Sequence, residues 1–356
     1  MGQNNQTICA EKTAFKDLDL RAFEGLRTET DIQVAASEAV IKLRPETETQ
    51  PRVLYRFSGD DCILIEYGPV VLDMRIRFRV YHLEKTLKEA KIKGLCETAP
   101  GVRSLWVKYD PLQLPLEKLM DTLLEIEANL TDIDSTVVTS RLLRLPIAYN
   151  DQWTQKAIDQ YIATIRKEGP YLPDNMAFIA RANGLSGADE VIQKHLDTEH
   201  MVLGLGDVYL GAPCSVPLDP RCRLVVPKYN PARTYTPEGG VGIGGTYGCI
   251  YPMASPGGYQ LIGRTLAIWD TFQKRPGFEE APWLLRQFDR LQYYSVSEEK
   301  LIELREKNSS GAYNFEISEG TFSLKEHLDF CEGIADETNA FKTQQRAAID
   351  VATVGY

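Results

Sequence analysis

Apolar residues recur along this chain with two different periods, and the changes of period divide it into regions. The first fifty residues show no apolar period and end in the proline-flanked run Arg44 to Pro51, so we expect a leader and linker, compatible with disorder, over residues 1–51. Strand-like and helix-like stretches then alternate, which predicts a small α/β domain over residues 52–145 with its helices on one sheet face, in a ferredoxin-like layout. The expected elements are strands at 62–67, 102–109 and 137–145 and helices at 78–92 and 116–130.

The pattern changes at residue 146, where a helix over 153–167 and a helix-turn-helix pair around 183–187 are followed by short β-prone pieces. Glycine and proline interrupt these pieces in a way that is typical of a small barrel with functional loops, which we expect over residues 146–272. The expected strands are 202–205, 223–226, 247–251, 259–262 and 266–269.

The last region, residues 273–356, carries charged stretches of helical period over 283–305 and 323–350. We expect a helical C-terminal extension that wraps the barrel or docks on a partner. The predicted fold class is therefore α+β.

Composition narrows the class of protein without changing this organisation. The chain has 356 residues, 43% of them hydrophobic and 25% charged, which is ordinary for a globular protein of about two domains. Its formal charge of −10 offers no positive field to phosphates, so nucleic acid is not an expected partner. There is no run of 18 apolar residues and no charged-then-apolar start, so we expect no membrane span, no secretory signal and a cytoplasmic location.

Cysteine and histidine usage argues against a metal site. The seven cysteines include no C-x-x-C pair, and the four histidines are not at ligand spacing near them. We therefore expect reduced, mostly buried cysteines and no metal. His195 and His200 lie near an expected helix end, where surface histidines stabilised by the helix dipole are more common than general bases.

A glycine cluster, Gly240 to Gly245, satisfies the G-x-G-x-x-G pattern literally. A dinucleotide site would need a helix at the third glycine, whereas a strand ending in Pro252 follows, so we reject that interpretation. Glycines lack the Cβ atom that would block a ligand, so their backbone N–H groups can approach a small anionic or carbonyl ligand. The candidate substrate-binding residues here are Gly242, Gly244 and Gly245, with Tyr247 and Tyr251 from the following strand.

Three further segments carry candidate chemistry. Arg264 follows a Pro-Gly-Gly turn and a short strand and suits a carboxylate, although an arginine that ties down a neighbouring loop through carbonyls is an equal alternative. The glycine-rich stretch 204–213 places one carboxylate and one phenol in a candidate ligand loop, and the loop 228–235 concentrates cations and an amide. The catalytic candidates are Asp207, Tyr209, Lys228 and Arg233, and the added substrate-binding candidates are Asn230, Gln260 and Arg264. The sequence contains no Ser-His-Asp arrangement, nucleophile elbow or P-loop lysine, so it offers no catalytic residue pattern for a hydrolase or a kinase.

Several of these motifs together resemble a known family. The motifs are GLGDVYLGAP at 204–213, PLDPR at 217–221, KYNPART at 228–234, GIGG at 242–245, PWLLRQFD at 282–289 and SVSEE at 295–299. They resemble the allophanate hydrolase subunit 1 domain family, which includes the bacterial sporulation-kinase inhibitor KipI and one half of bacterial oxoprolinase. The version they resemble most is the carboxyltransferase region of urea carboxylase, and the resemblance covers about residues 60 to 345.

The resemblance implies a small α/β domain followed by a cyclophilin-like β-barrel. It also implies half of a carboxyltransferase, which moves a carboxyl group from carboxybiotin to urea or a related amide in a cleft shared with a subunit 2 type, KipA-like chain. The chain has no ATP-binding biotin-carboxylase part and no Ala-Met-Lys-Met biotin carrier, so we expect no covalently bound cofactor and no carboxylation by this chain alone.

Two alternatives stay open. The first is a stand-alone cyclase, isomerase or lyase that acts on a small metabolite without biotin, as a monomer or a homo-oligomer, because ligand pockets are often reused while folds persist. The second is a regulatory protein that binds a kinase, as KipI does, although KipI-like chains lack the urea-carboxylase-type loops.

Overall fold

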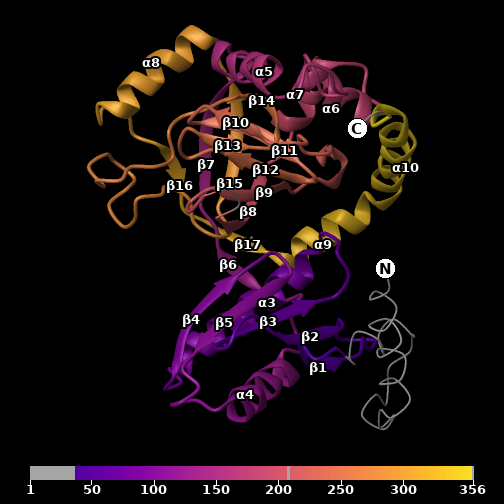
Figure 1. The fold of residues 1–356 in the computed structure, drawn as a ribbon, viewed down its shortest axis with the longest axis vertical. Helices are drawn as coiled ribbons and strands as arrows, with labels where there is room; N and C mark the ends of the chain where they lie inside the picture. The colour runs from indigo at the N-terminus through magenta and orange to yellow at the C-terminus, as the bar shows by residue number, and fades with distance from the viewer. Residues whose placement is uncertain (1–36, 207–208, 355–356) are drawn as a thin grey trace, which may run out of the picture. The chain divides into compact units, whose positions relative to one another are not determined.

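The computed structural model describes residues 37–206 and 209–354. The chain divides into two compact units, Met1–Asp134 and Ser135–Tyr356, of which the described parts are shown in Figure 1. Each unit has a hydrophobic core of its own.

The first unit is an antiparallel sheet with two helices. Its elements are β1 (Val40–Arg44), β2 (Val53–Phe57), β3 (Cys62–Tyr67), α3 (Met74–Glu89), β4 (Leu95–Pro100), β5 (Ser104–Tyr109) and α4 (Leu116–Asn129). The strand order is β1-β2-β3-β5-β4, and every neighbouring pair is antiparallel. Apolar residues of α3 and α4 join those of β2, β3 and β5 in a single core. A helix begins at Met74 because the Asp73 side chain accepts a hydrogen bond from the Arg75 backbone N–H group.

Three features of this unit differ from the sequence prediction. The strand β1 lies inside the expected leader, because its backbone pairs with β2 at the sheet edge. The strands β2 and β4 are absent from the prediction, since short strands carry little periodic signal. The strand expected at 137–145 does not close this sheet: it divides into β6 and β7, which pair within the second unit.

The second unit is built around a closed barrel (Figure 1). Its elements are β6 (Val137–Thr139), β7 (Leu142–Tyr149), α5 (Gln152–Thr164), α6 (Asn175–Ala182), α7 (Ala188–Leu196), β8 (His200–Leu205), β9 (Pro213–Pro217), a 3-10 turn (Pro220–Cys222), β10 (Arg233–Thr236), β11 (Gly240–Gly244), β12 (Tyr247–Ile250), β13 (Ser255–Gly257), β14 (Gln260–Arg264), β15 (Arg290–Ser295), α8 (Glu298–Ser309), β16 (Glu316–Ser318), β17 (Thr321–Ser323), α9 (Leu324–Gly333) and α10 (Ala335–Ala352). The sheet order is β14-β11-β12-β9-β8-β15-β7-β16. The first seven strands close into a ring because β14 also pairs with β7. The barrel is mixed, since β15 and β7 run parallel while the other pairs are antiparallel.

The helix-rich prediction for the C-terminal region holds only in part. The expected helix over 283–305 is wrong in its first half, which contains β15. In β15, Leu291 and Tyr293 are buried and alternate with more exposed neighbours, which is strand period, and β15 fills the gap between β8 and β7. The prediction over 323–350 is confirmed by α9 and α10. Of the other expected strands, 223–226 and 266–269 form isolated bridges only, at Val226 and Trp269.

Two of the three buried histidines of the second unit are His195 and His200. Their place in the sequence favours surface positions, but His195 is 5% exposed and His200 is 3% exposed. His195 Nδ1 lies 2.8 Å from the Tyr149 hydroxyl, and His200 Nε2 lies 2.9 Å from the His195 carbonyl oxygen. The surface prediction is wrong because His195 ends α7 on the side that packs on the barrel, and His200 opens β8. Burial lowers the pKa of His200 to about 4 and lowers the pKa of His195 well below its usual value.

Acid should therefore destabilise the second unit before its carboxylates protonate. The histidines stay neutral in the folded state, whereas in the unfolded state they bind protons below about pH 6.5, so the stability is fully present above that pH and falls as the pH approaches 4. For His200 alone the loss is roughly 3 kcal/mol at pH 4, at about 1.4 kcal/mol per pKa unit. Urea denaturation at several pH values between 7.5 and 4 measures this slope. His200→Gln keeps a donor for the His195 carbonyl but cannot titrate, and an unchanged slope in that variant would contradict the prediction.

Candidate functional site

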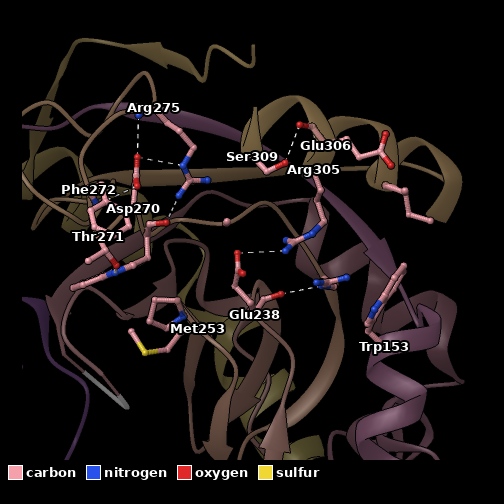
Figure 2. A pocket seen from close by; sticks show the side chains of 15 residues that line it. Trp153, Glu238, Met253, Asp270, Thr271, Phe272, Arg275, Arg305, Glu306 and Ser309 are labelled. Atoms are coloured by element: carbon pink, nitrogen blue, oxygen red, sulfur yellow. Dashed lines mark hydrogen bonds and ion pairs between the residues drawn. The ribbon is translucent and has the colours of Figure 1, made fainter. Parts of the chain in front are cut away.

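A pocket of about 570 Å³ opens at the barrel end where β14 finishes (Figure 2). Its side chains come from the start of α5, the turn between β10 and β11, the segment before β13, the end of β14 with the loop that follows it, and the helix α8. The lining residues are Trp153, Glu238, Pro252, Met253, Arg264, Ala267, Trp269, Asp270, Thr271, Phe272, Arg275, Ile302, Arg305, Glu306 and Ser309. All of them belong to the second unit. This volume suits a ligand with more than a few heavy atoms.

The turn between β10 and β11 places a carboxylate in this pocket. The Gly240 N–H group donates to the Pro237 carbonyl over 3.0 Å, and Gly239 has a φ of 77°, as a tight turn of this type requires. A Cβ atom on Gly239 would also lie 2.5 Å from the Thr265 carbonyl oxygen and 2.5 Å from Arg305 Nη1. A glycine therefore lets the chain pass beneath these two groups, and Glu238 is left at the tip of the turn.

Two guanidinium groups meet at Glu238. Arg264 Nε donates to the Glu238 carbonyl oxygen over 2.8 Å, and the guanidinium carbon of Arg264 lies 4.5 Å from the centroid of the Trp153 ring. Arg305 Nη1 donates to the Thr265 carbonyl oxygen, and Arg305 Nη2 lies 3.4 Å from Glu238 Oε1. The backbone turn thus joins an arginine at the end of a barrel strand to an arginine on α8.

Burial shifts the pKa values of both arginines downward, and the charge of Arg264 adds to the shift at Arg305. Burial lowers the pKa of Arg264, and burial followed by the charge of Arg264 lowers the pKa of Arg305 to about 10. Both groups stay protonated at neutral pH. The nearby carboxylate of Asp151, which caps α5, has a pKa raised by burial. This end of the pocket therefore combines fixed donors with acceptors, which suits a planar ligand that carries both kinds of group.

At the other end of the pocket, Asp270 and Arg275 form a closed pair. Asp270 Oδ2 lies 3.3 Å from Arg275 Nε, and the carboxylate accepts hydrogen bonds from three backbone N–H groups of its own loop. Burial alone would raise the pKa of Asp270, but these N–H groups outweigh it and keep the pKa below its usual value. The pair orders the loop that carries the exposed Phe272 at the rim.

Comparison with known proteins matches this chain to the carboxyltransferase domain, subdomain C and D, over residues 53–278. The chain belongs to this family. It is 38% identical to the urea amidolyase of Saccharomyces cerevisiae over 336 residues, which is 94% of this chain and 18% of that protein. The crystal structure of the Kluyveromyces lactis urea amidolyase matches 89% of this chain and 19% of that one, at 38% identity and a TM-score of 0.83.

One subunit of the Bacillus subtilis 5-oxoprolinase is 27% identical over 70% of this chain and 96% of its own length. The chain thus spans about a fifth of the length of the urea amidolyases that it matches. Its match to the bacterial 5-oxoprolinase subunit covers nearly the whole length of that subunit. The urea-carboxylase-like and KipI-like family expected from the motifs is confirmed.

In this carboxyltransferase domain, one sequence-predicted site residue, Arg264, lines the pocket. Arg264 also donates to a carbonyl in the neighbouring turn, which is the loop-fastening role weighed for it from the sequence, and its binding of a carboxylate stays a prediction.

Six other candidates gather around Tyr259, outside the pocket. Lys228 Nζ lies 4.6 Å from the centroid of the Tyr259 ring, and Arg233 Nη1 donates to the Tyr259 carbonyl over 2.6 Å. The Tyr259 N–H group lies 3.4 Å from the Tyr251 hydroxyl oxygen. A Cβ atom on Gly242 would lie 2.9 Å from the Tyr259 Cβ atom, and one on Gly244 would lie 2.4 Å from the Tyr259 ring, so the Tyr259 side chain occupies the space that the glycines leave. Gln260 is fully buried and donates to the Pro227 carbonyl over 2.8 Å.

Five candidates remain, of which Tyr247 packs against the hydrophobic cluster that contains Tyr251 and Tyr259. Asn230 is exposed, and its carbonyl oxygen accepts a hydrogen bond from the Tyr171 hydroxyl. Gly245 exchanges backbone hydrogen bonds with Val226, and Tyr247 pairs with Gly244 in the barrel ladder. Tyr209 is 37% exposed, and Asp207 lies outside the described residues.

Sequence reasoning missed Trp153, Glu238 and Arg305. The run Pro237-Glu238-Gly239-Gly240 is a turn signal, so it could have placed Glu238 on a tip. The capping residue Asp151 could have placed Trp153 in the first turn of a helix. Nothing local distinguishes Arg305 from the other charged residues of α8, because its role comes from a contact 40 residues away in sequence.

Within the described ranges, no group of three or more His, Cys, Asp or Glu side chains is arranged to hold a metal ion, and no helix is long and apolar enough to cross a bilayer. No disulfide joins the six described cysteines, and Cys62, Cys222 and Cys249 are buried. Cys9 lies outside the described residues.

Proposed function

We propose that this chain is one half of a carboxyltransferase that moves a carboxyl group from a biotin borne by another domain or chain to a nitrogen of urea or a related amide. The observation that carries the proposal is the 38% identity to urea amidolyase over 94% of the chain, within a carboxyltransferase family. The similarity to a 5-oxoprolinase subunit along nearly its whole length supports action as a component of a multi-subunit assembly, which we place in the cytoplasm.

The donor set of the pocket fits a carboxylated ureido group. The terminal nitrogens of Arg264 face no hydrogen-bond acceptor among the described residues, and the indole of Trp153 covers the guanidinium. A partner-borne biotin would supply the activated carboxyl group. Arg264 would orient a carboxylate or an amide carbonyl, and the aromatic walls would exclude water from it.

The cluster around Tyr259 supports a second binding role. Arg233 Nε and Gln260 Oε1 are buried and have no partner among the described residues. Buried polar atoms are rarely left unpaired, so we propose that these two, with Lys228 and Tyr251, serve substrate or partner binding. The roles of Asp207, Tyr209 and Asn230 also stay proposals.

Exposed apolar residues of the second unit support a partner wall. Phe272, which lines the pocket, is 76% exposed, and Leu210, in the loop between β8 and β9, is 60% exposed. We propose that a subunit 2 type, KipA-like chain covers this side, since exposed aromatic and aliphatic anchors of this kind mark interaction surfaces.

The finer fold classes are proposals too. In the first unit, the order β2-β3-β5-β4 with a crossover through α3 from β3 to β4 supports a ferredoxin-like fold in which β2 takes the place of the last strand. In the second unit, the closed barrel flanked by helices supports a cyclophilin-like class.

Gentle purification from native cells tests the function. We expect a stoichiometric subunit 2 type polypeptide and a covalently biotinylated carrier, either as separate chains or within one polypeptide, and an assembly that carboxylates urea or a related amide. Isolation of the chain alone or as a homo-oligomer without biotin would refute the proposal. That result would favour the stand-alone cyclase, isomerase or lyase, which is supported by a pocket lined by the second unit alone.

A further inference from the structure

Glu238 occupies a special position among the carboxylates of the pocket. Its backbone carbonyl accepts from Arg264, and its Oε1 lies 3.4 Å from Arg305 Nη2, so both the backbone and one edge of the carboxylate are held. Its side chain is nevertheless 40% exposed, and no hydrogen bond from a described residue accounts for Oε2. One carboxylate oxygen is therefore fixed by a cation while the other faces the pocket (Figure 2).

The other carboxylates near the pocket are less suited to accept a proton from a ligand. Asp270 accepts three backbone hydrogen bonds and pairs with Arg275, which keeps its pKa low. Asp151 is buried at the start of α5, where it accepts from the Thr154 N–H group, and it does not line the pocket. Glu306 lines the outer part on α8 and makes no described contact with either guanidinium. Only Glu238, among these described carboxylates, combines contact with the guanidinium pair and an open oxygen.

The proposed reaction requires such a group. An amide nitrogen that attacks a carboxyl carbon must lose a proton, because an amide N–H group is a weak acid and the product nitrogen carries one hydrogen fewer. A carboxylate beside the nitrogen can take that proton as the bond forms. The guanidinium of Arg305 keeps the carboxylate in one orientation, as a positioning contact should.

We propose that Glu238 is the proton acceptor of the transfer step; this inference rests on the proposed function. As the bond from the amide nitrogen to the carboxyl carbon forms, the bond from that carbon to the donor nitrogen of the carrier breaks. Glu238 Oε2 takes the proton from the amide nitrogen and returns it to the donor nitrogen, which leaves with the electron pair of the broken bond. No proton is gained or lost overall, and no oxidant or reductant is needed.

The test compares two partial reactions of the assembly purified from native cells. One is carboxylation of urea, and the other is release of CO₂ from the carboxylated carrier when no acceptor is present. The second reaction takes its proton from solvent and does not deprotonate an amide. Glu238→Gln should reduce urea carboxylation by about 10²- to 10⁴-fold, the usual contribution of a positioned acid or base, while CO₂ release stays within about twofold. Glu238→Asp keeps a carboxylate at a longer distance and should retain intermediate transfer.

Glu303→Gln is the matched control. It removes an ion-paired carboxylate from the surface of α8, where Glu303 contacts Lys300 and Lys307, and both reactions should stay unchanged. Full transfer activity in Glu238→Gln would overturn the inference and leave the proposed function standing. Equal loss of both reactions in Glu238→Gln and Glu238→Asp would overturn the inference as well. That result would show that Glu238 maintains the pocket structure and has no separate role in proton transfer. An unmodified assembly that cannot carboxylate any amide would refute the proposed function itself.

Discussion

Replacement of Arg264 by lysine should reduce carboxyl transfer by about 10²- to 10³-fold, the loss seen when a preorganised donor is removed from a transition state. Lysine keeps the charge but loses the Nε bond to the Glu238 carbonyl and the planar contact with Trp153. Both contacts fix the direction of the donors, so the charge alone should not restore activity. Initial rates of urea carboxylation by the native assembly measure the effect, with thermal melting to show that the fold is kept.

Arg286→Lys is the control for the Arg264 variant. Arg286 lies on the surface, where it pairs with Glu280 over 2.6 Å, and both side chains are at least half exposed. The same chemical change there should leave transfer unchanged. If the transfer rate of Arg264→Lys stays within about threefold of the rate of the unmodified enzyme, the loss is far smaller than removal of a preorganised donor causes. Arg264 would then not belong to the proposed site.

The position of Arg264 shows what a local sequence pattern can predict. A turn, a short strand and an arginine are consecutive in sequence, so the placement of Arg264 at the end of a barrel strand follows from local rules. Its partners do not follow from them. Trp153 and Arg305 come from helices 111 and 41 residues away, and only the closed barrel brings them to the same strand end.

The glycine cluster shows the opposite case. Glycines at alternate positions allow a ligand to approach the backbone, but they equally allow a side chain to do so. Gly242 and Gly244 face the Tyr259 side chain, which lies only 15 residues beyond Gly244 in the sequence, but the sequence does not predict its direction. The residue type indicates close approach and does not indicate what approaches.

The strand β15 shows why the barrel could be predicted only as a class. Charged residues on both sides of Leu291 and Tyr293 produce a helical period when a window of about twenty residues is taken, whereas the strand itself is six residues long. Its pairing with β7 joins residues 148 positions apart. The short strand-like stretches of 201–270 therefore predict a barrel, but they do not include β15, the strand that completes it.

Replacement of Asp289 by alanine should cost about 3–5 kcal/mol of the free energy of unfolding, the largest effect on stability that we expect from a single substitution. Asp289 is 2% exposed, and Arg141 donates to it through Nε at 2.9 Å and Nη2 at 2.5 Å. The Arg286 backbone N–H group also donates to it over 2.7 Å. Without the carboxylate, the buried guanidinium of Arg141 loses its countercharge at the point where β7 and β15 begin to pair. Urea denaturation at pH 7.5 measures the change.

An exposed pair between β7 and β16 is the matched control. Arg144 and Glu316 lie 3.0 Å apart with about half of each side chain exposed, so Glu316→Ala should cost less than about 1 kcal/mol. The double variant Arg141→Met, Asp289→Leu separates two causes. If the cost of Asp289→Ala comes from an orphaned charge, removal of both charges should restore most of the stability, because an apolar pair of similar size needs no desolvation. If the double variant is as unstable as Asp289→Ala, the stability comes from the hydrogen bonds of Arg141 to the Leu284 carbonyl and of Asp289 to the Arg286 N–H group, and the ion pair itself contributes little.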